Sequence, residues 1–348
     1  MTQARQDQIS LEATSYYHCI SRCVRRAFLC GEDSLTGQNY DHRKQWVVDR
    51  LRELTGVFAI DICAYAVMAN HYHVVLRVDE ERAKAWTLTE VAAQWGRLFK
   101  HPLVVQRYLQ DQITSTAERD YAEQVLEGWR ERLTNVSWFM RSLNEYLARE
   151  ANREDGCTGR FWEGRFKSQA LLDEVAVLSC MSYVDLNPIR AGLTDNLDES
   201  DFTSIQARLR ALQDAAETPA EATATAAATE ANPQPAPVLP LVRAPEDGHV
   251  HALGLTATEY LDLVDWAGRA VRADKRGFIP EQVPPVLERL AIDPAGYLRH
   301  VTGQSGSVRS LALGAADKLQ AYARQLGQKF IRGQRPGRGL YGEALVSA

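Results

Sequence analysis

Residues 71–78, with the sequence HYHVVLRV, constrain the fold of this chain more than any other segment. Side chains of a β-strand alternate between its two faces. One face then carries four residues that can cover a hydrophobic core: Tyr72, Val74, Leu76 and Val78. The other face carries His71, His73, Val75 and Arg77. The segment therefore predicts a strand with a core on one side and two imidazoles on the other.

The two histidines have a chemical and a structural interpretation. Adjacent positions on one strand face lie about 6–7 Å apart, which suits joint binding of one divalent ion. The alternative is two ordinary, partly buried histidines. The spacing alone is weak evidence, because His249 and His251 share it in a segment without strand pattern. We interpret that second pair as residues at the end of a linker.

Other segments predict a mixed α+β fold. Strand composition occurs at residues 15–24 and 57–68, and residues 159–172 look extended. A helix is expected from Asp41 to about Gly56, with its apolar face formed by Val47, Leu51 and Leu54. Two further helices are expected at 137–152, with Phe139, Leu143 and Leu147 on one face, and at 173–187, with Val177, Met181 and Val184 facing inward.

The domain organisation follows from shifts in composition. Residues 212–240 consist largely of Ala, Thr, Glu and Pro, which is typical of a flexible linker. The predicted parts are an N-terminal tail at 1–14, a main domain at 15–211 with a mainly helical insertion at 80–155, a linker at 212–245, a separate all-helical C-terminal domain at 246–332, and a basic tail at 333–348.

The bulk composition excludes several classes of protein. Of the 348 residues, 45% are hydrophobic and 24% are charged, and the net charge is −5, so no chain-wide basic excess points to nucleic acid. No run approaches the ~20 apolar residues of a membrane span. Six cysteines without C-x-x-C spacing favour a reduced, cytoplasmic protein. A zinc site formed by His18, Cys19, Cys23 and Cys30 is an alternative that we do not favour, because the cysteines have no C-x-x-C spacing.

The histidine pair needs partners if it is to act chemically. Tyr183 and Asn187 lie four residues apart on the predicted 173–187 helix, and therefore on one face. A tyrosine hydroxyl becomes a nucleophile when cations and a polarised target assist it, and Asn187 can offer a carbonyl oxygen. The pattern alone favours a simpler interpretation, with Tyr183 at the edge of the core and Asn187 ending the helix before Pro188.

Taken together, four segments resemble the single-tyrosine HUH transposases, most closely the REP-associated tyrosine transposase type. The similarity covers residues 15–210 and rests on YYHCISRCVRRAFLCGED, AVMANHYHVVLRV, the stretch from SWFMRSLNEYL to KSQALLDE, and MSYVDLNPIRAGL. It implies a ferredoxin-like antiparallel sheet with flanking helices. Two departures are a tyrosine, Tyr72, at the middle of the histidine motif, and a long helical stretch before Gly159.

The resemblance also implies an activity. His71, His73 and Asn187 would bind a divalent metal, Mg²⁺ or Mn²⁺, and Tyr183 would be the nucleophile that cleaves single-stranded or hairpin DNA through a 5′-phosphotyrosine and then rejoins strands. The two imidazoles favour the softer Mn²⁺. The resemblance leaves open whether the enzyme is a monomer or a homodimer.

Clustered basic residues are the candidate DNA contacts, despite the acidic balance of the chain. They are Arg22, Arg25, Arg26, Arg160, Arg165, Lys167 and Arg190. Phe161, Trp162 and Phe166 alternate with some of them, which suits either base stacking or a packed aromatic face.

Two other functions compete with strand cleavage. One is a domesticated protein that binds hairpin DNA without cutting it. The other is a metal hydrolase acting on nucleotides, which would need a third alternating histidine where the chain has Val75.

Overall fold

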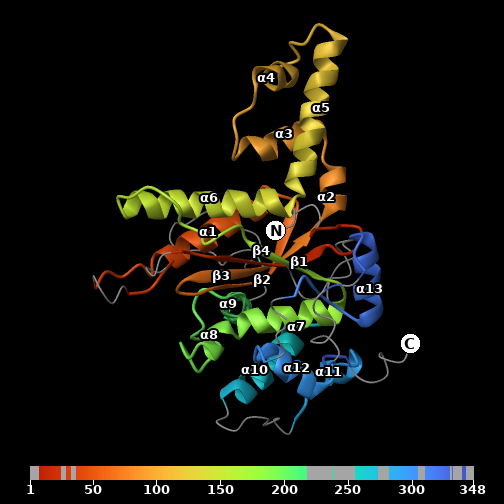
Figure 1. The fold of residues 1–348 in the computed structure, drawn as a ribbon. Helices are drawn as coiled ribbons and strands as arrows, with labels where there is room; N and C mark the ends of the chain where they lie inside the picture. The colour runs from red at the N-terminus through yellow and green to blue at the C-terminus, as the bar shows by residue number, and fades with distance from the viewer. Residues whose placement is uncertain are drawn as a thin grey trace.

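The computed structural model describes residues 8–24, 29–32, 37–217, 238, 255–272, 282–304, 310–329, 331 and 339–341. These residues form a mixed α+β structure around one five-stranded sheet (Figure 1). The strands are β1 (Tyr16–Arg22), β2 (Ile60–Val67), β3 (His71–Val78), β4 (Lys167–Leu171) and β5 (Ala312–Leu313). Their order is β2-β3-β1-β4-β5; β1 pairs antiparallel with both β3 and β4, and β5 pairs parallel with β4.

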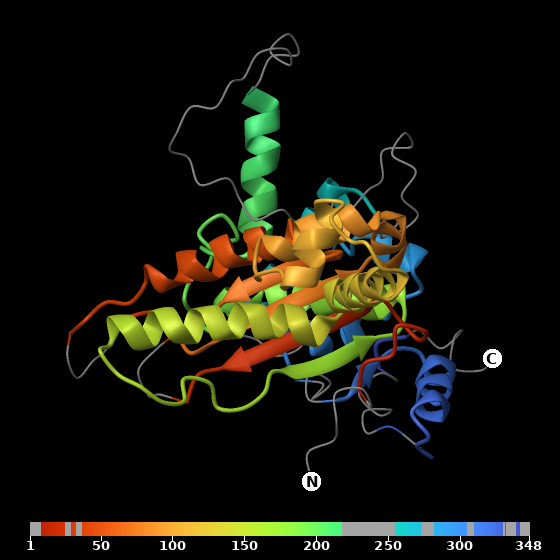
Figure 2. The same ribbon diagram turned by 90° about the horizontal axis from the view of Figure 1, so that it is seen from above.

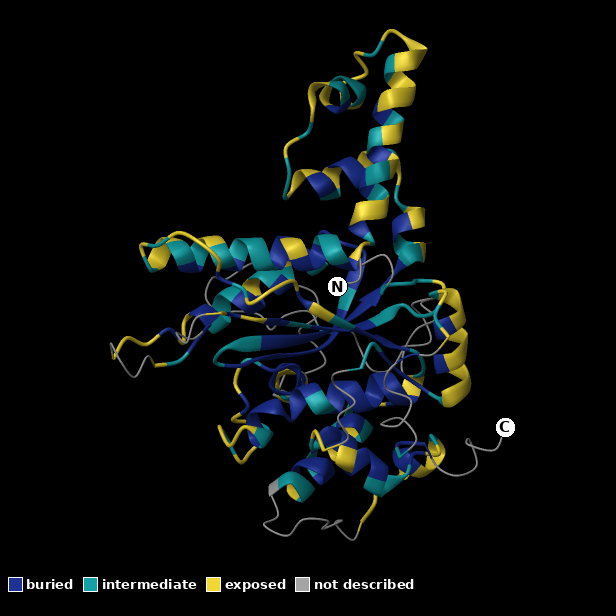
Figure 3. Ribbon diagram, in the orientation of Figure 1, coloured by how far each residue is buried: buried dark blue, intermediate teal, exposed yellow. Residues whose placement is uncertain are grey.

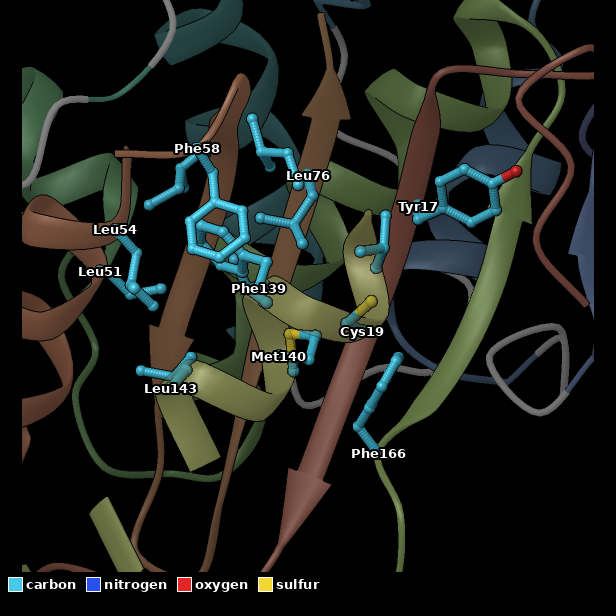
Figure 4. Close-up of a cluster of buried hydrophobic side chains, with 14 of the residues drawn as sticks. Tyr17, Cys19, Leu51, Leu54, Phe58, Leu76, Phe139, Met140, Leu143 and Phe166 are labelled. Carbon is cyan, nitrogen blue, oxygen red and sulfur yellow. The ribbon is translucent and has the colours of Figure 1, made fainter. Parts of the chain in front are cut away.

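One face of the sheet carries the larger hydrophobic core. Helices α1 (Arg43–Thr55) and α6 (Val136–Glu154) run side by side across this face (Figures 1 and 2). The apolar faces predicted for both helices lie in this core, as do the four β3 residues from Tyr72 to Val78 that were predicted to face it. Figure 4 shows Phe58, Leu76, Phe139 and their neighbours packed between the helices and the strands. The alternation of β3 is confirmed.

The opposite face of the sheet is covered by α7 (Glu174–Asp185), which is buried along most of its length (Figure 3). The strands present small side chains to it, among them Ala64 and Ala66 on β2 and Val75 on β3. Small residues let a helix approach a sheet closely, so α7 lies directly over the strand face that carries the histidines. The polar face of β3 is thus an interior surface.

Four helices form an arm that projects from the sheet (Figure 1). They are α2 (Glu80–Ala85), α3 (Leu88–Gly96), α4 (Leu103–Leu109) and α5 (Thr116–Leu133). The ring of Trp95 stacks on Phe99 and on Trp129, with centroids 4.3 Å and 5.3 Å apart, so aromatic packing holds α3 against α5.

The C-terminal segment differs from the separate all-helical domain that we predicted. Its helices are α10 (Ala257–Arg272), α11 (Pro285–Arg289), α12 (Pro294–Val301) and α13 (Ala316–Gln325), and β5 extends the main sheet. Residues of α10 and α12 share one hydrophobic cluster with α7. The prediction was wrong because these helices cover an apolar surface of α7, a long-range relation that composition does not reveal.

Polar contacts at both ends of α7 also join it to the C-terminal segment. Asp173 accepts hydrogen bonds from the Ala176 backbone at the start of α7, and from Ala315 N at 2.7 Å and Tyr341 Oη at 2.8 Å. At the other end, the Tyr260 hydroxyl of α10 donates to Asp185 Oδ2 at 2.5 Å. The C-terminal segment therefore fixes the position of α7 over the sheet.

The predicted linker begins later than its composition indicates. Helix α9 (Ser204–Glu217) continues six residues past the predicted boundary at 211, because ALQDAAE contains good helix formers. Most of the remaining linker, the second histidine pair and most of the basic tail lie outside the described residues. Within the described residues, no helix has the length and apolarity needed to cross a membrane.

The first prediction concerns the buried carboxylate of Asp185. Tyr260→Phe removes the hydrogen bond that the Tyr260 hydroxyl donates to the buried Asp185 carboxyl group. We expect this change to lower the free energy of unfolding by about 1–3 kcal/mol. Denaturant unfolding measures this change. Tyr121→Phe is the matched control, because Tyr121 lies on α5 and is 58% exposed. Equal stability of the two variants would contradict the anchoring role of Tyr260.

Candidate active site

The predicted histidine and tyrosine side chains meet between β3 and α7. The ring centroids of His71 and His73 lie 4.9 Å apart, and those of His73 and Tyr183 lie 5.9 Å apart. Tyr183 is half-buried, whereas its neighbours Ser182 and Val184 on α7 are fully buried. The phenol thus reaches the histidines from the helix and keeps part of its surface exposed to solvent.

Asn187 joins this group, but it is not on the same helix as Tyr183. Helix α7 ends at Asp185, and Asn187 opens the short helix α8 (Asn187–Arg190). The prediction of one continuous helix was therefore wrong. Pro188 has no backbone N–H to donate to Val184, and a turn at Leu186 separates the two helices.

Arg190 links Tyr183 to Asn187. Its guanidinium carbon lies 3.6 Å from the centroid of the Tyr183 ring, and its Nη2 donates to Asn187 Oδ1 at 2.7 Å. Its Nε is buried with no hydrogen-bond partner in the structure. The turn after α12 closes over this pair at Gly303, where a β-carbon would lie 3.1 Å from Arg190 Nη1. Helix α8 and the turn after α12 therefore hold the guanidinium of Arg190 against the phenol of Tyr183.

Two further histidines, which sequence reasoning did not assign to the site, complete it. His18 of β1 shares a 2.8 Å hydrogen bond between its Nε2 and His73 Nδ1. His300 of α12 also lies beside Tyr183, with ring centroids 6.2 Å apart. The signal for His18 is its place on the same strand face as Ile20 and Arg22, but only the register of β1 against β3 brings it to His73. No local pattern marks His300.

Burial keeps these imidazoles uncharged. Burial lowers the pKa of His18 and His71 to about 4 each, and it places the pKa of His73 well below its ordinary value. Positive charges act in the same direction, from Arg22 and Arg190 on His71 and from Arg190 on His73. At neutral pH the site therefore offers imidazole nitrogen lone pairs and not imidazolium ions.

Three side chains of this site, those of His71, His73 and Asn187, have atoms that could bind a divalent cation. His71 Nδ1 is hydrogen-bonded to Asn70 Oδ1 at 2.7 Å, and His73 Nδ1 is hydrogen-bonded to His18, so each ring can direct its Nε2 elsewhere. This is the arrangement in which metal-binding histidines are usually held. The carbonyl oxygen of Asn187 has a second lone pair besides the one that accepts from Arg190. The described residues contain no group of three or more His, Cys, Asp or Glu side chains placed around one ion.

The other candidate DNA contacts fall into two groups. Arg22 is exposed at the end of β1, directly opposite His71 on β3. Arg160, Arg165 and Lys167 are also exposed, on the loop and strand that run beside the end of β1. The guanidinium of Arg160 donates to backbone carbonyls of its own loop, at Trp162 and Glu163. Arg25 and Arg26 lie outside the described residues.

The aromatic residues of this loop belong mainly to the core. Phe161 and Phe166 are buried, and the indole Nε1 of Trp162 donates to Asn144 O at 2.8 Å. Their alternation with basic residues therefore reflects a packed face below a charged one, and Phe161 and Phe166 expose too little of their surface to stack on bases.

Comparisons with known proteins add little to this geometry. No family model and no curated protein match the chain. Among solved structures, it is similar to a REP-associated tyrosine transposase bound to a REP hairpin, with 12% sequence identity and a TM-score of 0.35. That match covers 60% of this chain and 86% of the other. A similarity of this size assigns neither a family nor a function.

The second prediction concerns His300, whose pKa burial lowers to about 3. As the pH falls, this histidine binds a proton in the unfolded chain, where its pKa is near 6.5, before it does so in the folded protein. The free energy of unfolding is therefore unaffected above pH 6.5 and decreases as the pH falls below that value. At pH 5 the loss amounts to about 2 kcal/mol for such a group. We expect His300→Gln to lose less stability than the wild type between pH 7.5 and pH 5.

Urea unfolding at the two pH values measures this difference, and His101→Gln on the arm serves as the control. A wild-type pH dependence in His300→Gln would show that the imidazole of His300 is not buried in its uncharged form.

Proposed function

We propose that this chain is a metal-dependent tyrosine enzyme that cleaves and rejoins single-stranded or hairpin DNA, in the manner of single-tyrosine HUH transposases. One observation carries the proposal: the β3 imidazoles and the α7 phenol, 110 positions apart at His73 and Tyr183, meet with ring centroids 5.9 Å apart. Tyr183 packs at the edge of the hydrophobic core, but a half-exposed tyrosine beside uncharged imidazoles and a guanidinium also has the surroundings that a nucleophile requires.

The order of the elements supports the ferredoxin-like part of the proposal. Along the chain, β1, α1, β2, β3, α6 and β4 follow the β-α-β-β-α-β pattern of that fold, with the arm α2–α5 inserted after β3. The sheet order β2-β3-β1-β4 places β1 and β3 side by side at its centre. The histidine pair is thereby carried by an inner strand, where neighbouring strands on both sides hold it in place.

In the proposed reaction, Tyr183 Oη attacks the phosphorus of a DNA phosphodiester. A bond forms between Oη and phosphorus, the bond from phosphorus to the 3′-oxygen breaks, and the phenol proton is transferred in net terms to the leaving 3′-oxygen. The products are a 5′-phosphotyrosine and a free 3′-hydroxyl. Attack by the 3′-hydroxyl of another strand reverses the step and joins the strands, so the reaction consumes no external energy source.

The residues of the site divide this work. Arg190 places a positive charge beside the phenol as the latter loses its proton, which stabilises the developing negative charge. His71, His73 and Asn187 would hold Mg²⁺ or Mn²⁺. When bound, such an ion would withdraw charge from the phosphorus atom. Because Tyr183 lies beside the histidines of its own chain, one chain supplies both nucleophile and metal ligands, which favours action in cis.

The proposed DNA path follows the exposed basic residues near the open side of the site. Arg22 lies beside His71, and Lys167 lies on β4 opposite Ile20 of β1. We therefore expect Arg22, Arg160, Arg165 and Lys167 to contact the phosphate backbone, with Arg190 nearest the scissile phosphate.

The third prediction tests the nucleophile. The probe is a pool of oligonucleotides with one imperfect hairpin stem and randomised single-stranded flanks, labelled at the 3′ end and incubated with Mn²⁺. We expect a labelled covalent complex on denaturing gels with the wild type and none with Tyr183→Phe. The same pool labelled at the 5′ end should give shortened free DNA and no labelled protein, because the phosphotyrosine stays with the 3′ fragment.

A labelled complex that persists in Tyr183→Phe would assign the nucleophile to another residue. Tight binding of the pool without any covalent complex would instead favour the alternative function, a hairpin-binding protein that does not cut.

The fourth prediction tests the metal ligands. We expect His73→Ala to weaken Mn²⁺ binding, measured by calorimetry, by more than the about 10–100-fold that loss of an outer-shell partner costs. Chelator should abolish the covalent complex of the wild type. Tyr183→Phe is the matched control, because it should bind Mn²⁺ as the wild type does. Undiminished Mn²⁺ binding by His73→Ala would remove the metal from the proposal.

A further inference from the structure

The turn that ends α12 lies against the candidate site and contains a glycine, Gly303. The Gly303 backbone N–H donates to His300 O at 2.9 Å, and that of Gln304 donates to Arg299 O at 3.0 Å, a pair of hydrogen bonds that closes many helix ends. Gly303 has a φ of +77°, a left-handed conformation that favours glycine. The backbone of this turn therefore gives one reason for a residue without a side chain.

The surroundings of Gly303 give a second and independent reason. A β-carbon at this position would lie 3.1 Å from Arg190 Nη1 and 3.7 Å from Tyr183 Cε2. Non-bonded heavy atoms pack best at about 3.5–4.0 Å, so a side chain here would overlap the guanidinium but only touch the phenol ring. The guanidinium of Arg190 thus occupies space that any other residue at position 303 would need.

Arg190 is the partner that would move if this space were filled. Helix α12 is anchored by Tyr297, Leu298 and Val301, which lie in the hydrophobic cluster that it shares with α7. The guanidinium, by contrast, lies at the end of a flexible side chain, where it stacks on the Tyr183 ring and donates to Asn187 Oδ1. A β-carbon at position 303 would therefore displace the guanidinium from the face of the phenol.

We propose that Gly303 is a positioning residue: its bare backbone confines the guanidinium of Arg190 to the face of Tyr183, so that the C-terminal segment forms one wall of the active site. The inference rests on the proposed function, in which the charge of Arg190 stabilises the phenol oxygen as it loses its proton. It gives the C-terminal helices a part in the reaction besides their packing against α7.

Gly327 provides a matched control for the backbone conformation. It ends α13 in the same kind of turn, with a φ of +65°, and its N–H donates to Arg324 O at 3.0 Å while that of Gln328 donates to Ala323 O at 2.8 Å. Among the described residues, no atom lies within 4 Å of a β-carbon built on Gly327. Gly303→Ala and Gly327→Ala therefore strain the backbone alike, and only the former meets Arg190.

The first measurement is NMR of the full-length protein with nitrogen-15 arginine. Protons over an aromatic ring give signals at unusually high field, and an Arg190→Lys sample identifies the guanidinium signal of Arg190 by its loss. We expect a high-field signal in the wild type and in Gly327→Ala, and a signal at an ordinary position in Gly303→Ala. Gly303→Asn should behave as Gly303→Ala, because asparagine tolerates the left-handed conformation better but has the same β-carbon.

The second measurement is the rate at which the covalent complex forms with Mn²⁺ and the hairpin oligonucleotide pool labelled at the 3′ end. We expect Gly303→Ala and Gly303→Asn to slow this step by up to about 100-fold, since small displacements of catalytic groups cost that much. Gly327→Ala should react at the wild-type rate. Urea unfolding of each variant verifies that it is folded under the conditions of the assay.

The outcomes separate this inference from the proposed function. An ordinary Arg190 signal in the wild type, or a high-field signal in both Gly303 variants, would show that Gly303 does not position the guanidinium. Equal rates in Gly303→Ala and Gly327→Ala, whether reduced or not, would also overturn the inference. If the wild type forms no covalent complex, the proposed function fails, and the NMR signal alone decides whether Gly303 positions Arg190.

Discussion

A buried carboxylate at the end of α7 fixes the geometry on which the candidate site depends. Asp185 is fully buried, and it accepts hydrogen bonds from Ser204 Oγ, from the Ile205 backbone and from the Tyr260 hydroxyl. A buried carboxylate is tolerated only when such donors satisfy it, so α7, α9 and α10 must meet at this point. Tyr183 lies two residues earlier on α7. The hydrogen bonds that satisfy this buried carboxyl group therefore also set where the phenol lies.

The second constraint is that the polar face of β3 is an interior surface. Imidazoles enclosed between a sheet and a helix stay uncharged, and an uncharged imidazole needs a partner for its N–H group. In this protein two such contacts are made at the Nδ1 atoms of the histidine pair: Asn70, beside β3, contacts His71, and His18, on β1, contacts His73. The hydrogen bonds that these buried rings need also fix their orientations, and a metal site requires ligands with fixed orientations.

Much of the local structure could be predicted because it depends on short-range patterns. The period-two alternation of β3 separated its core face from its histidine face, and the three- and four-residue spacing in α1, α6 and α7 identified their buried sides. His71, His73 and Tyr183 could be named as candidates from the sequence, because the residue types themselves indicate metal binding and nucleophilic attack. One failure was local, because Pro188 interrupts the helix before Asn187. The other was long-range, because the C-terminal segment packs on α7 in spite of the linker-like composition before it.

The sequence by itself determined which faces of the strands and helices are apolar, and it placed two imidazoles, a phenol and an amide at positions that chemistry could use. Only the tertiary structure decided that these groups meet, and that His18, Arg190 and His300 meet with them. The reason is physical. Alternation and helical period are properties of a few consecutive residues, whereas the register of β1 against β3 and the packing of α7 and α12 depend on contacts between residues far apart in the chain.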